Sequence, residues 1–566
     1  MKATDKFSLL HGETDPRTRR TLTPVRVLTA RGDVRGEKYL CERKPVQVAI
    51  YPHHDGCRLT NGAEGERAAV LVDFGIELHG SLNLSVWEVQ NPAAKTVSVR
   101  IRLGESASEA LTPVGERGAT NDHATRDFAL PVSFYSSNET PESGFRFAYI
   151  ELETMSAAVE LRAVTATLIF RDLEYRGSFA SSDPLLDRIW DTAAYTVQLN
   201  MQRYLWDGVK RDRLVWAGDM NTEINTILAV FGGESGDVVR RSLDLVRDVT
   251  PPDCFMNGLS SYSLWWVLCH YDWYMGTGDR AYLDAQREYL CELLPHFYAY
   301  IGEDGAERLP DRRFFDWPNE DRPGAKHAGL QGLFREALRA GGALLAYMGE
   351  SERADECLRQ AGRLLLHKPD PCGAKQAAAM LSLSGIGDPA QMCEGVILPG
   401  GAEGLSTFLG YFTLSALGEA GLTENALALM REYWGGMLSA GATTFWEDFD
   451  IAWLENSFRI DELPVPGRHD IHGDYGAHCY KNLRHSLCHG WASGPAPFLT
   501  KYVLGVRPFA PGMRAVRFDP DLGGLAWARG IVPTPCGDIS VELERAANGR
   551  TLRKITAPDG VDVVVK

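Results

Sequence analysis

Hydrophobic and polar residues alternate along residues 44–172, in short segments rich in β-branched side chains. A period of two is typical of strands that bury one face. Gly, Pro, Asn and Asp separate the segments, as expected for turns. Strands are expected at 46–50, 69–74, 82–87, 97–103, 148–153 and 159–169. The pattern therefore predicts a β-sandwich in the first third of the chain.

The spacing becomes helical after Phe179. Ser182 or Asp183 can cap a helix that has Pro184 in its first turn, and apolar residues then recur at steps of three and four. Further helices are expected at about 219–230, 236–248, 262–276, 280–302, 328–348, 350–366, 373–384, 403–418, 423–438 and 484–504. This number of helices suggests about six antiparallel pairs. Because neither end shows a polar capping repeat, a closed ring is favoured over an open superhelix.

Alternation returns after Gly505, with strands expected at 515–518, 525–532, 538–543, 552–557 and 561–565. The predicted fold class is therefore a multidomain α and β protein. Its expected parts are an N-terminal β-sandwich module at 1–175, a helical domain at 176–504 and a C-terminal β module at 505–566.

Composition and charge exclude several classes of partner. The 566 residues include 75 acidic and 59 basic ones, for a formal net charge of -16, which gives no chain-wide attraction to nucleic acid or to an anionic membrane. The first twenty residues lack the apolar core of a signal peptide, and no later run approaches the roughly 20 apolar residues that span a bilayer. The 11 cysteines form neither a CxxC nor a CxxH pair, which favours reduced thiols over disulfides or a zinc site. We expect a cytoplasmic protein; its oligomeric state stays open.

The densest chemical cluster lies at residues 206–219, where Asp207, Asp212 and Asp219 are interspersed with three basic residues and with Trp206 and Trp216. The three acids are too far apart for one helix face, so a loop must present them. Indole faces can stack on sugar rings, while carboxylates and arginines bind hydroxyls. The alternative is a solvated loop held together by Asp–Arg pairs.

A second cluster surrounds Glu447, which follows Trp446 and precedes Asp448 and Asp450. An apolar wall and neighbouring like charges raise a carboxyl pKa and suit it to proton transfer. The alternative is a helix-to-loop junction with Trp446 in the core. The weaker candidates are Asp316, Trp317, Glu403, His489 and Trp491.

Two separated acidic clusters bordered by Trp are what glycosidic hydrolysis requires, because one acid protonates the leaving oxygen and the other activates water or attacks the sugar. Lyases, phosphorylases and sugar-binding proteins also carry paired acids.

Four segments resemble one family. Residues 207–219 are similar to the motif D-x-P-x-R-E-R-L-G-W-x-G-D of the family 78 glycoside hydrolases, the α-L-rhamnosidases. Residues 441–447 resemble the GATT-x-WE element of that family, 486–491 its S-x-x-H segment and 315–317 its DW loop. The order and spacing of these elements also agree, and the resemblance covers roughly residues 44–566.

This resemblance implies an (α/α)6 barrel flanked by β-sandwich modules and an inverting mechanism. It makes Glu447 the general base and Asp212 the general acid. It also makes Asp207, Asp219 and Asp316 ligands of sugar hydroxyls, Arg211 a holder of the charge network, Trp216, Trp317 and Trp446 walls of the pocket, and His489 a substrate contact.

Three positions depart from the motif. Asp212 stands where the family has Glu, Val209 where it has Pro and Val215 where it has Gly. A displacement of about 1 Å in a catalytic group can cost on the order of a hundredfold in rate. Three explanations are open: the loop is shifted, the substrate sits differently, or Asp207, Asp219 or Glu223 donates the proton.

The sequence thus predicts an inverting, exo-acting α-L-rhamnosidase that releases terminal rhamnose from oligosaccharides or glycosides, without a cofactor or a catalytic metal. For inversion, Asp212 and Glu447 should lie about 6.5–9.5 Å apart. The alternatives are a related barrel hydrolase that acts on another deoxy sugar or a uronate, and a catalytically weak carbohydrate-binding protein.

Overall fold

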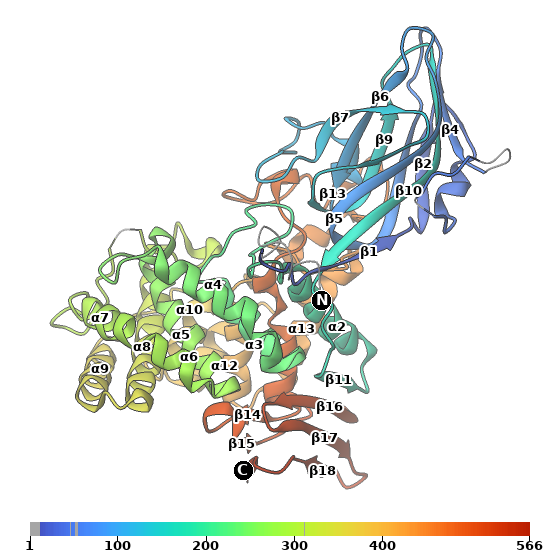
Figure 1. Ribbon diagram of the computed structural model, residues 1–566. Helices are drawn as coiled ribbons and strands as arrows, with labels where there is room; N and C mark the ends of the chain where they lie inside the picture. Colours follow the sequence, from blue (N-terminus) through green and yellow to red (C-terminus); the bar gives the residue numbers. More distant parts are fainter. Residues whose placement is uncertain (1–11, 46, 51–54, 311) are drawn as a thin grey trace, which may run out of the picture.

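The computed structural model describes residues 12–45, 47–50, 55–310 and 312–566. The N-terminal strands form a body that stands at one end of a large helical part, and the last strands of the chain lie at another side of that helical part (Figure 1). None of the helices in the described ranges is long and apolar enough to cross a membrane.

The N-terminal strands join in one sheet of ten strands with its own hydrophobic core. They are β1 (Thr18–Leu22), β2 (Arg26–Arg31), β3 (Asp33–Arg35), β4 (Cys57–Asn61), β5 (Ala69–Gln90), β6 (Thr96–Gly104), β7 (Asp127–Ser133), β8 (Ser136–Glu139), β9 (Ser143–Leu152) and β10 (Ala157–Phe170). A short helix, α1 (Ala107–Leu111), follows β6.

The predicted strands from 97–103 onward are confirmed, whereas 69–74 and 82–87 are two parts of the single strand β5. The register of β5 against β9 shifts between Asp73 and Leu78. Gly75 has φ of 80° there, a conformation that glycine adopts without strain. The predicted strand 46–50 is wrong for residues 47–50, which are not in a strand, and Val46 lies outside the described residues.

The helical part begins as predicted. The Asp183 carboxylate accepts a hydrogen bond from the backbone N–H of Leu185 at 2.9 Å, and Pro184 opens the helix. The helices are α2 (Pro184–Asn200), α3 (Met220–Val230), α4 (Gly236–Asp248), α5 (Ser260–Thr277), α6 (Arg280–Ala285), α7 (Arg287–Tyr298), α8 (Pro323–Met348), α9 (Ser351–Arg363), α10 (Lys375–Leu383), α11 (Pro389–Met392), α12 (Gly410–Glu419), α13 (Thr423–Ser439) and α14 (Pro495–Phe498).

Three expected helices are shorter or interrupted. The stretch 280–302 divides at Gln286 into α6 and α7, and residues 403–409 form turns before α12. The stretch 484–504 is helical from Gly490 onward, in a 3-10 helix, α14 and a π-helix, but the prediction is wrong for residues 485–489, which are a buried loop. Backbone carbonyls in this region accept hydrogen bonds from the Lys210 side chain, a use that an α-helix would deny them.

One set of helices closes on itself. In the described ranges, α3 contacts α5, α5 contacts α8, α8 contacts α10, α10 contacts α12, α12 contacts α14 and α14 contacts α3. The N-terminal ends of α3, α5 and α12 follow Asp219, Leu259 and Leu409, so the loops that precede these helices meet at one end of the ring.

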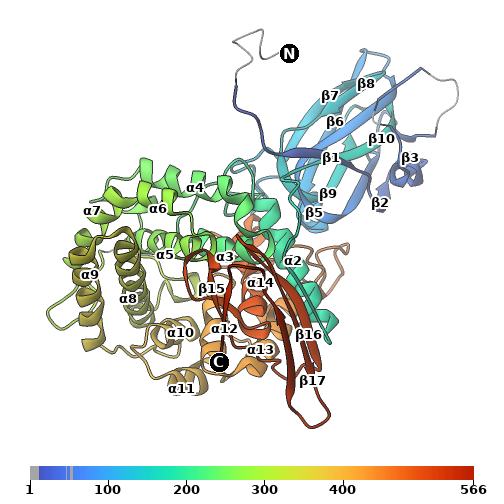
Figure 2. The same cartoon turned by 60° about the horizontal axis from the view of Figure 1, so that its bottom comes forward.

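The C-terminal strands form two sheets against the helical part (Figure 2). One has the order β11 (Ser178–Ser181), β16 (Trp527–Thr534), β17 (Gly537–Arg545) and β18 (Thr551–Thr556). The other contains β14 (Val506–Pro508), β15 (Ala515–Phe518) and β19 (Asp562–Val565), and a separate pair joins β12 (Ser457–Phe458) to β13 (His469–Asp470). These elements confirm the strands expected after Gly505. Because β11 precedes α2, the last sheet contains a strand from before the helical part.

Candidate active site

The 207–219 loop connects α2 to α3 and is folded by its own polar groups. The Asp207 carboxylate accepts a hydrogen bond from the backbone N–H of Leu214 at 2.9 Å, and Gly208 pairs with His489 in an isolated β-bridge. Asp212 and Arg213 have φ of 56° and 55°. Such left-handed conformations cost of order 1 kcal/mol or more per non-glycine residue and are found at functional sites.

Four buried side chains converge where this loop meets the 486–491 segment. His489 Nε2 lies 3.5 Å from Glu447 Oε1, 3.7 Å from Asp219 Oδ2 and 3.8 Å from Asp207 Oδ2. Burial and neighbouring acids raise the pKa of Asp207 well above its ordinary value, and burial also raises that of Asp219. Burial lowers the His489 pKa well below its usual range. The site thus favours neutral carboxyls beside a neutral imidazole.

Arg211 joins the two acids that the sequence analysis placed in catalysis. Its Nη2 donates to Glu447 Oε1 at 2.6 Å and its Nη1 to Asp212 Oδ1 at 3.0 Å. Asp212 and Glu447 accept hydrogen bonds from the two terminal nitrogens of one planar guanidinium. The width of this group therefore limits the distance between the two carboxyl groups. Burial opposes the charge on Arg211, but Glu447 and Asp212 raise its pKa.

The two acids differ in exposure. The Glu447 side chain is 2% exposed, and its Oε2 accepts a hydrogen bond from the backbone N–H of Ser486 at 3.2 Å. The Asp212 side chain is 20% exposed and lies 3.2 Å from His123 Nδ1, in the connection between β6 and β7. Asp212 is therefore held at the surface by one group of the helical part and one of the N-terminal sheet.

The predicted aromatic residues occupy different environments. Trp446 is fully buried against Phe449, whereas Trp216 and Trp317 are only partly buried. Trp317 Nε1 donates to the Tyr480 hydroxyl at 2.5 Å, and the Arg211 guanidinium lies 5.1 Å from the Tyr480 ring centroid. Tyr480 thereby links the 315–317 loop to the catalytic acids.

Asp316 is 1% exposed, and burial raises its pKa to about 8. Glu223 is also buried, with no hydrogen-bond partner for its carboxylate, and it faces Gly490, where a Cβ atom would lie 1.5 Å from Glu223 Oε1. Asp450 instead caps the turn that follows it, accepting from the backbone N–H of Ala452 at 2.9 Å.

Two domain families and a curated relative match parts of the chain. Residues 174–331 match the bacterial α-L-rhamnosidase 6 hairpin glycosidase domain, and residues 505–566 match the bacterial α-L-rhamnosidase C-terminal domain. An α-L-rhamnosidase of Alteromonas sp. (strain LOR) is 24% identical over 532 residues, which cover 85% of this chain and 54% of that protein.

Two parts of the chain, residues 174–331 and 505–566, therefore match domains of bacterial α-L-rhamnosidases.

Solved structures share the fold. The family 78 rhamnosidase of Bacillus sp. GL1 superposes with a TM-score of 0.74 at 23% identity, covering 92% of this chain and 55% of that one. A Klebsiella oxytoca rhamnosidase, solved with rhamnose bound, gives a TM-score of 0.69 at 22% identity and covers 86% of this chain and 96% of its own. The chain spans about half the length of the Alteromonas relative.

A cavity of about 870 Å³ lies among the same helices but contains none of the predicted site residues. Residues of α3, α5 and α12 line it, together with Lys501 and its neighbours. Because neither Asp212 nor Glu447 lines it, this cavity is separate from the candidate active site.

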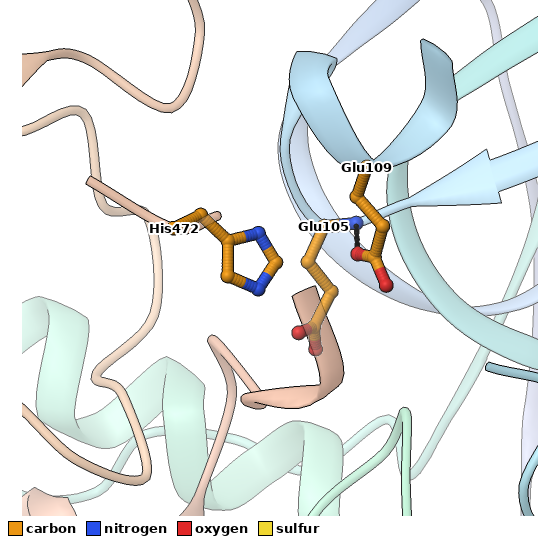
Figure 3. Close-up of side chains that lie close together, drawn as sticks. All are labelled: Glu105, Glu109 and His472. Atoms are coloured by element: carbon orange, nitrogen blue, oxygen red, sulfur yellow. Dashed lines mark hydrogen bonds between the residues drawn. The ribbon is translucent and has the colours of Figure 1, made fainter. Parts of the chain in front are cut away.

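Glu105, Glu109 and His472 form a second polar cluster and lie close enough together to hold a metal ion (Figure 3). Lys210 already occupies this cluster, with its Nζ 3.2 Å from Glu105 Oε2 and 3.0 Å from Glu109 Oε1. Both His472 ring nitrogens are also hydrogen bonded, one to Ser106 and the other to the carbonyl of His485. The donor set therefore fits a buried ion-pair network better than a metal site.

This network connects the N-terminal sheet to the site. Lys210 donates to the carbonyls of Leu483 and His485, while Glu105 accepts from the backbone N–H of Leu487 at 2.6 Å. Burial raises the pKa of Glu105 to about 7 although Lys210 opposes that shift. The segment that bonds Glu447 is thus fixed from both sides.

Sequence reasoning did not find Glu105, His123, Tyr480 or Ser486 as site residues. Ser486 stands inside the S-x-x-H segment, so that motif was the available signal. Glu105 and His123 come from the N-terminal sheet, where no motif marks them.

We expect Lys210→Met to lower the free energy of unfolding by about 3–5 kcal/mol, because it leaves two buried carboxyls without their shared cation. Lys375→Met is the matched control: Lys375 donates to three backbone carbonyls, those of Ile397, Pro399 and Gly401, and its loss should cost about 1–3 kcal/mol. Chemical denaturation measures both. Equal losses, or no recovery when Glu105→Gln is added to Lys210→Met, would contradict the network.

Asp316 should make stability depend on pH. Its pKa of about 8 in the folded state, against 3.8 for a free side chain, means that its stabilisation is present at low pH and is lost as pH rises through 8. The free energy of unfolding of wild type, relative to Asp316→Asn, should fall by roughly 1.4 kcal/mol per pH unit between about pH 5 and pH 7. Parallel pH profiles for the two proteins would show that the Asp316 pKa is not raised.

Proposed function

We propose that the chain is an exo-acting α-L-rhamnosidase that hydrolyses terminal α-L-rhamnose from oligosaccharides or glycosides with inversion. The observation that carries the proposal is the Arg211 guanidinium, which holds Asp212 and Glu447 in one site. Those two residues come from separate motifs, at positions 212 and 447 of the chain. They meet only in the folded protein.

The ring of α3, α5, α8, α10, α12 and α14 supports an (α/α)6 barrel, with the remaining longer helices outside it. In this proposal the N-terminal module spans 1–175, the barrel 176–504 and the C-terminal module 505–566. β11, which precedes the barrel, pairs with β16 and so joins the last module to the start of the barrel.

Inversion needs a water molecule between the base and the anomeric carbon, which requires carboxyl groups about 6.5–9.5 Å apart. The Arg211 guanidinium between Asp212 and Glu447 keeps the two carboxyls out of direct contact and is compatible with this gap. Glu447, bonded by Arg211 and Ser486, is the proposed base that deprotonates water.

Asp212 is the proposed acid because it reaches solvent and can be reprotonated after each turnover, whereas Asp207, Asp219 and Glu223 are sealed. Protonated Asp207 and Asp219 can donate to sugar oxygens as well as accept from sugar hydroxyls. His489, Asp316, Trp216 and Trp317 complete the proposed rhamnose site. The fully buried Trp446 supports Glu447 by packing.

The rhamnose bound in the Klebsiella oxytoca structure and the names of the matched domains support a rhamnose-containing substrate. None of the proposed steps uses a metal or an organic cofactor; the residues above supply the acid, the base and the hydroxyl ligands.

Glu447→Gln should lower kcat on a para-nitrophenyl α-L-rhamnoside by at least about a thousandfold while rhamnose still binds, because the amide cannot take a proton from water. Proton NMR of the wild-type reaction should show the β-anomer of rhamnose first. Initial release of the α-anomer would refute inversion, and wild-type-like turnover by the variant would refute Glu447 as the base. Rhamnose binding without any wild-type turnover would instead favour the carbohydrate-binding alternative.

Two substrates with different leaving groups test whether Asp212 is the general acid. Asp212→Asn should slow hydrolysis of methyl α-L-rhamnoside about a hundredfold or more, but hydrolysis of the activated para-nitrophenyl rhamnoside much less, because nitrophenolate departs without a proton. Asp207→Asn is the matched control, and it should slow both substrates alike. The reverse pattern would move the acid role to Asp207.

A further inference from the structure

The N-terminal sheet reaches the proposed acid through one loop. His123 lies in the connection between β6 and β7, and its Nδ1 is 3.2 Å from Asp212 Oδ1. The His123 side chain is 39% exposed and its φ is 66°. The imidazole therefore contacts the same oxygen, Asp212 Oδ1, to which Arg211 Nη1 donates.

A groove of about 480 Å³ begins beside this contact. Its lining, within the described residues, consists of Asn121, His123, Ala124, Thr125, Pro141, Glu142 and Arg213. His123 touches Asp212 and Arg213 follows it in the chain, so the groove opens directly next to the acid.

Several polar groups of the groove are available to a ligand. Thr125 is exposed. Arg213 uses Nη1 to donate to the carbonyl of Glu142 at 3.2 Å and lies 4.7 Å from the ring centroid of Trp206. Asn121, in contrast, is used within its own loop, where its Oδ1 accepts from the backbone N–H groups of Arg126 and Asp127.

We propose that this groove is the leaving-group subsite and that it takes a hydroxylated sugar residue rather than an aromatic aglycone. The inference rests on the proposed function. The departing oxygen must lie within hydrogen-bond distance of Asp212. Arg211 and His123 both contact Oδ1 of that carboxyl, which leaves Oδ2 to carry the proton. Because His123 also lines the groove, the leaving group extends into it.

The chemistry of the lining selects the leaving group. Thr125, His123 and Arg213 offer a hydroxyl, an imidazole and a guanidinium, all of which hydrogen bond to sugar hydroxyls. The lining holds no Phe, Tyr or Trp among the described residues, and Arg213 covers the Trp206 ring. A flat aromatic aglycone would find few apolar atoms to bury.

His123 is also a positioning residue for the shortened acid. Arg211 and His123 both contact Asp212 Oδ1, so the orientation of the carboxyl depends on both groups. The N-terminal module thereby contributes to the reaction as well as to the groove.

The test compares two alcohol leaving groups. An α-L-rhamnosyl-glucose disaccharide and methyl α-L-rhamnoside both need the acid, but only the disaccharide has hydroxyls that can reach the groove. Thr125→Val and Arg213→Met should each lower kcat/KM for the disaccharide about tenfold more than for the methyl rhamnoside. Thr551→Val, on β18, is the matched control and should leave the ratio of the two values unchanged.

The outcomes separate this inference from the proposed function. A wild type that hydrolyses the para-nitrophenyl rhamnoside but not the disaccharide, or variants that change both alcohols by the same factor, would overturn the subsite while leaving the rhamnosidase assignment intact. A wild type inactive on every rhamnoside would overturn both.

The positioning role has its own readout. His123→Ala should slow the disaccharide and the methyl rhamnoside about tenfold or more while sparing the activated para-nitrophenyl rhamnoside, because only the alcohols need the acid. His123→Asn, which keeps an amide donor near the Nδ1 position, should restore part of the loss. Equal loss on all three substrates, with no recovery in His123→Asn, would assign His123 a purely structural role.

Discussion

The burial of one ammonium group organises the catalytic end of the molecule. Lys210 is 1% exposed, so its charge is removed from water. Glu105 and Glu109 pair with this charge, and the carbonyls of Leu483 and His485 accept hydrogen bonds from the ammonium group, which offsets the cost of burial. These partners come from the N-terminal sheet and from the loop before α14. Neither the sheet nor that loop can move independently of the 207–219 loop without leaving a buried charge unpaired. The position of both proposed catalytic acids therefore depends on a contact between modules.

The same balance of charge continues into the site. Asp207, Asp219 and Glu447 lie around one imidazole, and burial raises the pKa of the first two. Arg211 is the cation that lets Glu447 remain close to them, since its Nη2 binds Glu447 directly. The result is an arrangement in which the raised pKa values of Asp207 and Asp219 favour neutral carboxyls that can bind hydroxyls, while Arg211 holds the Glu447 carboxyl beside them.

The parts that could be predicted are those that local sequence encodes. Alternation and helical spacing located most strands and helices, and the clusters around Asp212 and Glu447 marked the acids before their proximity was known. The loop at residues 485–489 could not be predicted, because tertiary hydrogen bonds to Lys210 and Glu447 override its apolar spacing. Glu105 and His123 could not be predicted as site residues for another reason. They reach the site only when the N-terminal sheet packs against the 207–219 loop, a contact between segments about a hundred residues apart.

The replacement of the family glutamate by Asp212 is best understood as a change shared by the whole loop. Shortening the side chain withdraws the carboxyl by roughly 1.5 Å, and the left-handed backbone at Asp212 and Arg213 gives this part of the loop an unusual path. Val209, in place of proline, packs into the core of the N-terminal sheet, so the loop is anchored there by apolar contact. His123 then meets the Asp212 carboxyl from that same sheet. An acid whose reach depends on a neighbouring module is constrained by that module's packing, which links the stability of the N-terminal sheet to proton transfer at the glycosidic oxygen.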